Sequence, residues 1–370
     1  MTVGKIRVLV VDDSVVVRRM VTDVLNADPD IEVVGAAANG RIALQKIPQL
    51  NPDLITLDVE MPDMDGLTAV AEIRKTWISL PVIMFSTLTE RGAATTLDAL
   101  TLGASDYVTK PANVGSVTAA QQRIREDLIP KVKALCAKVL KGVPAPPNAA
   151  APRPAFAAGR PASTPANNRT IDLLAIGVST GGPNALALMM PFFPADFPVP
   201  IVITQHMPPM FTRLLAERLT KTSSLPFEEG ATGARVLPST AWVAPGDFHM
   251  GFERVGTQVA IRLDQGTPEN SCRPAVDAML RSAVAVYGSR ILFVILTGMG
   301  QDGVRGAELV KAAGGQVLAQ DEASSVVWGM PGFVVNAGLA DAVLPLKDMA
   351  HEIMRRVASG RPAKAALVYA

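Results

Sequence analysis

The stretch LLAIGVSTGG at residues 173–182 decides the fold of the second half of the chain. An apolar run ends in Gly-Val-Ser-Thr-Gly, and Pro183 then leads into a helical stretch, which predicts a strand, a sharp turn and a helix. Glycines on both sides of Ser179 permit a tight turn that lifts its hydroxyl clear of the sheet. The free N–H groups at the start of the helix can stabilise a developing negative charge. The pattern indicates a nucleophilic serine, with a purely structural Gly-rich turn as the alternative.

Two further strand ends carry the groups that a nucleophilic serine needs. His206 follows the apolar run VPIVITQ, and Asp302 follows ILFVILTGMGQ. Loops after parallel strands share one edge of a sheet, so Ser179, His206 and Asp302 are expected to meet there as nucleophile, base and orienting acid. Their order in the chain differs from the Ser, acid, His order of α/β-hydrolases, so that fold is not predicted. A backbone-bound histidine and a helix-capping aspartate are the structural alternatives.

Length and composition bound the remaining possibilities. The 370 residues favour two domains, and 49% hydrophobic residues suffice for extensive cores. A net charge of +1 gives no electrostatic case for nucleic-acid binding. No apolar run approaches the roughly 18 residues of a membrane span, so membrane insertion is not expected either. The distant cysteines Cys136 and Cys272 indicate no disulfide framework and suit a cytoplasmic location.

A shift in composition separates the two halves. Residues 142–169 hold seven Pro and nine Ala and have no acidic residue. Such a segment cannot bury enough apolar surface to fold, which predicts a semi-rigid tether. The expected divisions are a domain at 1–125, a helix and linker at 126–169, a second domain at 170–358 and a tail at 359–370.

The first half alternates apolar runs such as IRVLVV and DLITL with helical stretches, which predicts a parallel α/β sheet. Asp12 and Asp13 follow the first run, and Asp58 ends the third. Converging carboxylates repel one another unless a cation lies among them, and oxygen ligands of this kind suit Mg²⁺. Ser86 and Lys110 end two later runs, where a hydroxyl and an ammonium could hold a phosphoryl group.

These residues carry a resemblance to a known domain. The blocks VLVVDDS, LDVEMPDMDG, MFST and DYVTKP resemble the receiver domain of bacterial response regulators, over residues 5 to about 125. The resemblance implies a flavodoxin-like, parallel five-stranded sheet and phosphorylation by a histidine kinase. It assigns Asp58 as phosphoryl acceptor, Asp12 and Asp13 with Asp58 as Mg²⁺ ligands, Ser86 and Lys110 as sensors of the acyl phosphate, and Tyr107 as the aromatic that changes rotamer on activation.

The second half, over about residues 170–358, resembles the catalytic domain of the chemotaxis protein-glutamate methylesterases, the CheB family. The resemblance is carried by the blocks IGVSTGG, ITQHMPPMFTRLLAERL, WVAPGDFHM, CRPAVDAML, ILTGMGQDG and GMPGFVVNAG. It implies a doubly wound α/β catalytic domain with the same three residues as Ser-His-Asp triad, and no cofactor for ester hydrolysis. One departure is the pair Ser271-Cys272, where members often carry a basic or His residue, and this puts substrate contacts in doubt.

The two resemblances together imply a phosphorylation-activated hydrolase of chemotactic adaptation. The substrate would be a glutamate γ-methyl ester on the cytoplasmic helices of a methyl-accepting chemoreceptor, with methanol released, and receptor glutamines could be deamidated likewise. A chemotaxis histidine kinase would be the phosphodonor, and a cytoplasmic monomer is expected. The candidates for contact with the oxyanion or the substrate are Thr180, Met299, His249 and Arg273, the last two having a structural loop role as an equal alternative.

Control by the first half is a further expectation. A flexible tether would let the receiver cover the catalytic edge until phosphorylation at Asp58 shifts the balance toward an open form. Two other classes of function stay open. One is a phosphorylation-gated binding module with a degenerate hydrolase half, against which the three intact triad residues argue. The other is a transcription regulator, disfavoured because the second half has no basic helix-turn-helix.

Overall fold

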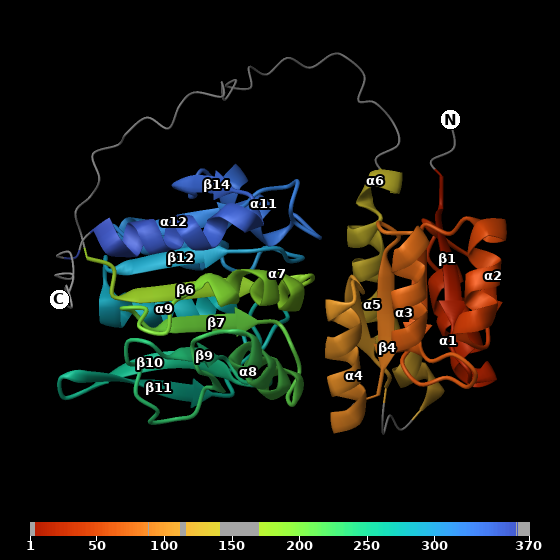
Figure 1. Ribbon diagram of the computed structural model, residues 1–370, viewed down its shortest axis with the longest axis horizontal. Helices are drawn as coiled ribbons and strands as arrows, with labels where there is room; N and C mark the ends of the chain where they lie inside the picture. The colour runs from red at the N-terminus through yellow and green to blue at the C-terminus, as the bar shows by residue number, and fades with distance from the viewer. Residues whose placement is uncertain (1–3, 88, 112–115, 141–169, 360, 362–370) are drawn as a thin grey trace, which may run out of the picture.

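The structure, a computed structural model, describes residues 4–87, 89–111, 116–140, 170–359 and 361 (Figure 1). They form two α/β units, one from each half of the chain. The predicted tether at 142–169 lies outside the described residues. Within the described part of the chain, no helix is long and apolar enough to cross a membrane.

The first unit is built on a parallel five-stranded sheet with the order β2-β1-β3-β4-β5. Its strands are short apolar runs, and their burial follows because helices cover both faces. The predicted flavodoxin-like sheet is therefore confirmed. The strands are β1 (Ile6–Val11), β2 (Ile31–Ala37), β3 (Leu54–Asp58), β4 (Val82–Ser86) and β5 (Asp106–Thr109). The helices are α1 (Val15–Asn26), α2 (Gly40–Leu50), α3 (Gly66–Thr76), α4 (Glu90–Thr101), α5 (Val117–Leu135) and α6 (Ala137–Leu140).

Side-chain caps set where the helices of the first unit begin. Ser14, Asn39, Asp65, Thr89 and Ser116 each accept a hydrogen bond from a backbone N–H in the following turn. Such a cap satisfies a donor that the helix itself cannot satisfy, and its loss typically costs about 1 kcal/mol. The chain therefore leaves each strand and enters each helix at a defined residue, which fixes the loops at the carboxyl edge of the sheet.

The last long helix of the first unit continues beyond the domain limit expected from the sequence. Leu128 and Val132 of α5, and Cys136 directly after it, are buried in the core of the first unit. The core of this unit therefore extends past residue 125.

The second unit is built on a parallel seven-stranded sheet with the order β14-β13-β12-β6-β7-β9-β8. Its strands are β6 (Leu173–Val178), β7 (Ile201–Gln205), β8 (Phe227–Glu229), β9 (Ala241–Val243), β12 (Ile291–Ile295), β13 (Gln316–Gln320) and β14 (Ala342–Leu344). Between β9 and β12 the chain forms an antiparallel hairpin of β10 (His249–Val255) and β11 (Gln258–Asp264).

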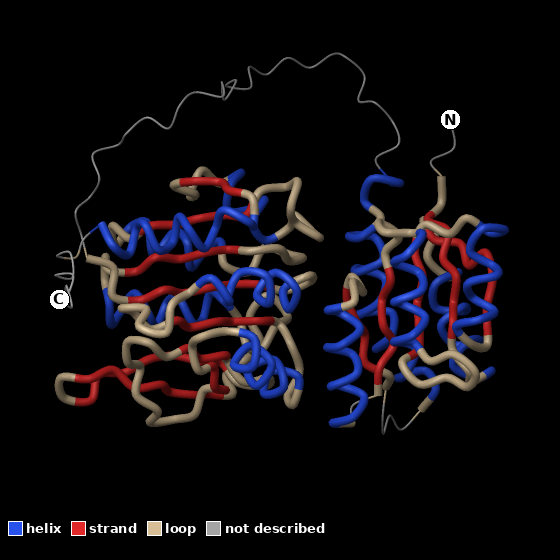
Figure 2. Tube along the Cα trace, viewed as in Figure 1, coloured by secondary structure: helices blue, strands red, loops and turns tan. Residues whose placement is uncertain are grey.

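Helices cover both faces of the second sheet, as the doubly wound expectation requires (Figure 2). One buried cluster lies under α7 (Gly182–Met189), the 3₁₀ helix η1 (Met190–Phe192), α8 (Phe211–Thr222) and α12 (Leu346–Ser359). The other lies under α9 (Val276–Tyr287), α10 (Val304–Ala312) and α11 (Met330–Asn336). The carboxyl ends of β12, β6 and β7 are thus neighbours at one edge of the sheet.

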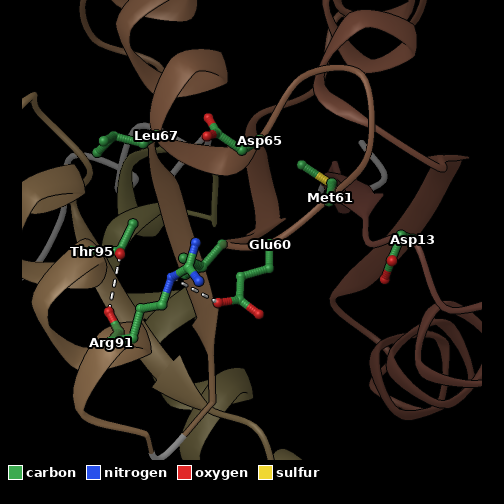
Figure 3. Close-up of a pocket in the computed structure, with 8 residues that line it drawn as sticks. Asp13, Glu60, Met61, Asp65, Leu67, Arg91 and Thr95 are labelled. Atoms are coloured by element: carbon green, nitrogen blue, oxygen red, sulfur yellow. Dashed lines mark hydrogen bonds and ion pairs between the residues drawn. The ribbon is translucent and has the colours of Figure 1, made fainter.

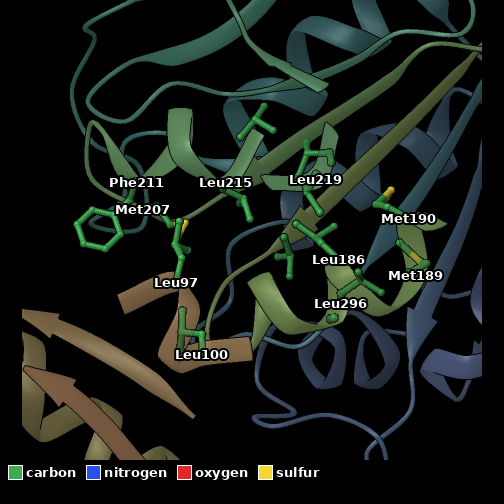
Figure 4. Packing of buried hydrophobic residues seen from close by; sticks show 14 of the residues in the cluster. Leu97, Leu100, Leu186, Met189, Met190, Met207, Phe211, Leu215, Leu219 and Leu296 are labelled. Atoms are coloured by element: carbon green, nitrogen blue, oxygen red, sulfur yellow. The ribbon is translucent and has the colours of Figure 1, made fainter. Parts of the chain in front are cut away.

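The two units touch through helix α4, which packs against α7 and α8 (Figure 1). Leu97 and Leu100 of α4 are 3% and 2% exposed and belong to the same buried cluster as Met207 and Phe211 of the second unit (Figure 4). The contact between the units is therefore a continuous apolar core rather than a few surface contacts.

Candidate functional site

Three side chains converge at the carboxyl ends of β6, β7 and β12. Val178 pairs with Gln205 across β6 and β7, so Ser179 and His206 are the first residues beyond neighbouring strand ends. The His206 backbone N–H donates to the Val178 carbonyl at 3.2 Å. From the far side of β6, Asp302 reaches across, and its Oδ2 lies 2.8 Å from Nε2 of His206. The sheet thus brings together the three residues that the strand ends indicate.

The turn that carries Ser179 is held rigidly from several sides. Its N–H donates to the Thr297 carbonyl at 3.0 Å, and its own carbonyl accepts from the N–H of Gly182 at 2.7 Å. The side-chain amide of Gln205 donates to the same carbonyl at 3.0 Å. A Cβ at Gly298 would lie 2.9 Å from Cβ of Ser179, so the loop after β12 can approach the serine only as glycine. These contacts leave the half-buried Ser179 hydroxyl at the tip of the turn.

Asp302 is held as a carboxylate. It is 1% exposed, and besides His206 its oxygens accept from the backbone N–H groups of Val276 at 2.6 Å and Asp277 at 3.0 Å. Those N–H groups open helix α9, where the helix dipole favours a negative charge. The amide of Asn270 adds a further bond at 3.0 Å. Burial alone would raise the pKa of Asp302, but the hydrogen bond and charge of His206, with the backbone donors, lower it.

The proton balance of His206 favours the imidazolium in this arrangement. Burial disfavours the charged ring, but hydrogen bonds to Asp302 and Cys272 and the charges of these groups raise the pKa of His206 to about 10. Because Nε2 is held by Asp302, a nucleophile would have to exchange its proton with Nδ1. Among the described residues, no hydrogen bond joins the Ser179 hydroxyl to His206, and such bonds often tighten only when substrate binds. To serve as the predicted base, His206 would therefore first have to lose a proton.

The candidate oxyanion donors lie beside the serine. Within the described residues, the backbone N–H groups of Thr180 and Met299 have no recorded hydrogen-bond partner, so both are available to a ligand. The hydroxyl of Thr180 is engaged elsewhere and donates to Oδ2 of Asp106 in the first unit at 2.6 Å. Their contact with an oxyanion stays a prediction.

His249 and Arg273 have structural partners. His249 is 4% exposed, its Nδ1 accepts from the Ala275 N–H at 3.2 Å, and its Nε2 donates to the Thr267 carbonyl at 3.1 Å. Arg273 donates to Oδ1 of Asp247 through Nη2 at 2.5 Å and to nearby loop carbonyls. These contacts favour the structural alternative for both residues, and a substrate contact for either stays a prediction.

Two polar residues next to Asp302 were not predicted from the sequence. Asp277 is 3% exposed, and its Oδ1 accepts from the N–H groups of Gly303 at 3.0 Å and Gly306 at 2.7 Å. Asn270 donates to Asp277 as well as to Asp302. The signal available in the sequence was an acidic residue in the first turn of a helix, which ordinarily indicates only a favourable helix start.

A second site lies at the carboxyl edge of the first sheet. Oxygen atoms of Asp12, Asp13 and Asp58 lie within 4.8 Å of one another. Nζ of Lys110 is 2.7 Å from Asp58 and 2.9 Å from Asp12. Burial, opposed by Lys110 and reinforced by the charge of Asp12, raises the pKa of Asp58 to about 6. Oδ2 of Asp12 is buried with the Lys110 ammonium as its ion-pair partner, and three carboxylates that converge in this way form the oxygen-only ligand set that a hard divalent cation such as Mg²⁺ prefers.

Ser86 and Tyr107 are turned away from the carboxylates. The Ser86 hydroxyl lies 2.7 Å from Oγ1 of Thr96 and 3.2 Å from the Gly92 carbonyl, both on α4. The Tyr107 ring stacks on Phe211 of the second unit, with ring centroids 4.6 Å apart and planes at 8°. Tyr107 therefore lies in the contact between the units, whereas Ser86 is bonded within the first unit.

A cavity of about 600 Å³ opens beside the acidic cluster (Figure 3). Arg91 at the start of α4 forms an ion pair with Glu60 at 3.9 Å on its wall. The other side chains that line it are Asp13, Val59, Met61, Asp65, Leu67 and Thr95. The acidic edge is thus accessible to a small phosphodonor from this side.

Comparison with known proteins matches both halves. Residues 174–353 match the CheB methylesterase family, and residues 8–122 match the response regulator receiver domain. A protein-glutamate methylesterase/protein-glutamine glutaminase of Trichodesmium erythraeum is 53% identical over 95% of this chain and 99% of its own length. One of Nocardioides sp. is 52% identical over 96% and 97%. The solved catalytic domain of Thermotoga maritima CheB methylesterase is 44% identical over 50% of this chain and 99% of its own, with a TM-score of 0.49.

These relatives align with the chain almost from end to end, and the receiver and hydrolase matches both lie within the aligned length. The alignment therefore shows the family of the whole chain. The chain belongs to the CheB family of protein-glutamate methylesterases, the chemotaxis response regulators that join a receiver to a hydrolase domain.

Proposed function

We propose that this chain hydrolyses glutamate γ-methyl esters on methyl-accepting chemoreceptors in the cytoplasm and releases methanol. The observation that carries the proposal is the buried His206–Asp302 pair at 2.8 Å, one strand end away from Ser179. The name of its relatives, protein-glutamate methylesterase/protein-glutamine glutaminase, supports the substrate class. The same name supports deamidation of receptor glutamines as a second activity.

The steps follow from the positions of the three side chains. The Ser179 oxygen attacks the ester carbonyl carbon while Nδ1 of His206 takes its proton, and Asp302 stabilises the resulting imidazolium. The carbonyl oxygen becomes an oxyanion that the N–H groups of Thr180 and Met299 can bind. Collapse breaks the bond to the methoxy group, to which His206 returns the proton, so methanol leaves. Water repeats the cycle on the acyl-enzyme and frees the glutamate. With an amide, ammonia leaves instead.

The receiver half would supply control. Asp58 is the proposed phosphoryl acceptor, with a chemotaxis histidine kinase as donor. Asp12, Asp13 and Asp58 would hold Mg²⁺, whose charge when bound lets an anionic donor approach three carboxylates. Lys110, already 2.7 Å from Asp58, is positioned to bind the acyl phosphate.

The contacts between the units support a covered resting state. Thr180, directly after the proposed nucleophile, donates to Asp106, and Met207, directly after the proposed base, packs in one cluster with Leu97 of α4. Tyr107, the residue expected to change rotamer on phosphorylation, is stacked on the second unit. A rotamer change would remove that stack, which is worth about 0.5–1.5 kcal/mol beyond its area. The receiver therefore would block a large helical substrate until Asp58 is phosphorylated.

The test of the proposed function is methanol release from membranes that contain methylated chemoreceptors. We expect release by the full chain, with a marked increase when acetyl phosphate and Mg²⁺ are added. Membranes from cells without the methyltransferase are the matched control and should release none. Binding of the chain to the membranes without any methanol would instead favour the binding-module alternative.

Reversing charges at the contact between the units should raise activity without phosphate. Asp98 and Glu90 of α4 lie 2.8 Å from Arg218 and Arg213 of α8, respectively. Changing both acids to arginine turns two attractions into two repulsions, each of them weak because the charges are exposed to solvent. We expect basal methanol release to rise about three- to tenfold.

The same experiment has two controls. Replacing Arg218 and Arg213 by acids in the reversed variant should restore the low basal rate, because the pairs form again with opposite polarity. Asp23→Arg, an exposed acid on α1 remote from α8, should leave the rate unchanged. A basal rate in the reversed variant equal to that of the wild type would mean that the receiver does not cover the site.

A further inference from the structure

Two buried carboxylates at the hydrolase site share one side-chain amide. Asp302 is 1% exposed and Asp277 is 3% exposed. Nδ2 of Asn270 lies 3.0 Å from Oδ1 of Asp302 and 3.1 Å from Oδ2 of Asp277. An amide nitrogen carries two hydrogens, so Asn270 can donate one to each carboxylate at the same time.

The remaining oxygens of the two carboxylates face in different directions. Oδ2 of Asp302 accepts from His206 and from the Val276 N–H. Oδ1 of Asp277 accepts from the first N–H groups around α10. Oδ1 of Asp302 and Oδ2 of Asp277 both accept from Asn270. Without this amide, the two acids would share a proton between these same two oxygens.

Close buried carboxylates ordinarily resolve their repulsion by sharing a proton. A proton on Asp302 would remove the negative charge that orients and stabilises the protonated His206. Burial, opposed by the Gly306 N–H and reinforced by the charge of Asp302, raises the pKa of Asp277, so the tendency to protonate is present at this pair. An amide supplies two hydrogens without a titratable proton and stabilises both anions.

The backbone around Asn270 is shaped to present this amide. Asn270 has a φ of 51°, in the left-handed region that asparagine tolerates better than most residues. Glu269 and Cys272 close a tight turn around it through two backbone hydrogen bonds of 3.1 and 2.8 Å. Arg281 of α9 anchors the turn through Glu269 at 2.5 Å. The amide therefore has a fixed position relative to α9 and Asp302.

We propose that Asn270 is a positioning residue of the hydrolase site. Its side-chain amide takes the place of a proton that Asp277 and Asp302 would otherwise share, and Asp302 therefore stays ionised next to His206. This role deepens the proposed function and rests on it, because it acts through the triad. Asn270 itself touches neither substrate nor the reacting atoms.

The test compares Asn270→Asp, Asn270→Gly and wild type as full chains by the pH dependence of kcat/KM for methanol release. The titratable and charged groups that face the site are His206, Cys272, Asp277 and Asp302, with the Glu269–Arg281 pair behind them. Asn270→Asp keeps the shape and the backbone preference but adds a third carboxylate, which holds a proton on His206 to higher pH. Asn270→Gly removes the donor and leaves the two acids free to share a proton.

Asn270→Asp should move the acid limb of the profile to higher pH by about one unit, equal to about a tenfold loss on that limb that disappears at alkaline pH. Asn270→Gly should move the acid limb to lower pH and reduce the maximal kcat/KM, because an Asp302 that shares a proton no longer stabilises the protonated His206. Asn51→Asp makes the same change at another left-handed asparagine, on the first unit, and should superimpose on wild type. A loss of equal size at every pH, accompanied by a lower Tm, would show that Asn270 is only structural. An unchanged profile in Asn270→Asp would also overturn the proposal.

A second measurement separates this proposal from the proposed function. The imidazole of His206 can be titrated by NMR in the same variants, whether or not methanol is released. We expect its pKa to be higher in Asn270→Asp than in wild type. An inactive wild-type chain would refute the proposed function, whereas equal His206 titrations in the two proteins would refute the role of Asn270.

Discussion

Replacing Ser179 by alanine is expected to abolish methanol release, with a loss of at least about 10⁴-fold, because nothing else in the site supplies the attacking oxygen. The variant should fold normally, since the half-buried side chain loses one oxygen and, among the described residues, its hydroxyl forms no hydrogen bond that holds the turn. The measurement is methanol release from methylated receptor membranes by the phosphorylated chain. Unchanged Tm and unchanged labelling of Asp58 by acetyl phosphate serve as controls for folding.

The proposed triad also predicts how the losses of activity in single variants combine in a double variant. Because nucleophile and base act as a unit, Ser179→Ala with His206→Ala should cost little more than either change alone. Asp302→Asn should be severe, since it removes the charge that stabilises the imidazolium. Near wild-type turnover in Ser179→Ala, or losses that multiply in the double variant, would remove the nucleophile assignment.

Replacing Asp58 by asparagine is expected to remove the acid-labile phosphoryl label completely, because the acceptor oxygen lies on that carboxylate alone. Labelling of the wild type by acetyl phosphate should require Mg²⁺ and fail in EDTA, since Asp12, Asp13 and Asp58 repel an anionic donor. Activation of methanol release by acetyl phosphate should be lost together with the label, while the basal rate remains. The readout is radiolabel on the protein before and after acid or base treatment.

Asp23→Asn is the matched control for this prediction. Asp23 is an exposed acid on α1 and lies outside the acidic cluster, so its variant should label like the wild type. Label that persists in Asp58→Asn, or that forms equally well without Mg²⁺, would contradict the assignment of the phosphorylation site.

The fold and the central site could be predicted because they follow from where strands end. Parallel strands bring their carboxyl ends to one edge whatever the loops do, so Ser179, His206 and Asp302 were expected together, as were the three aspartates of the first unit. Asn270 and Asp277 could not be predicted this way. Their position depends on how the segment after the β10–β11 hairpin packs over α9. The spacing of apolar residues in the sequence does not indicate how that segment packs.

The directions in which side chains point also could not be predicted from the sequence. Ser86 ends its strand as expected, yet its hydroxyl bonds to Gly92 and Thr96 of α4. The structure alone shows that Leu97 and Leu100 of α4 face a second unit. The sequence indicates that such residues are buried but does not say against what.

The stack of Tyr107 on Phe211 and the bond between Asp106 and Thr180 would make phosphorylation of the receiver and occupation of the hydrolase edge depend on each other. If phosphorylation frees the hydrolase edge, then occupation of that edge by a receptor must, by thermodynamic reciprocity, favour the phosphorylated receiver by the same factor. A receptor rich in methyl esters would thereby favour the phosphorylated form of the enzyme that demethylates it. The fraction of phosphorylated enzyme would then depend on the amount of methylated receptor as well as on the kinase.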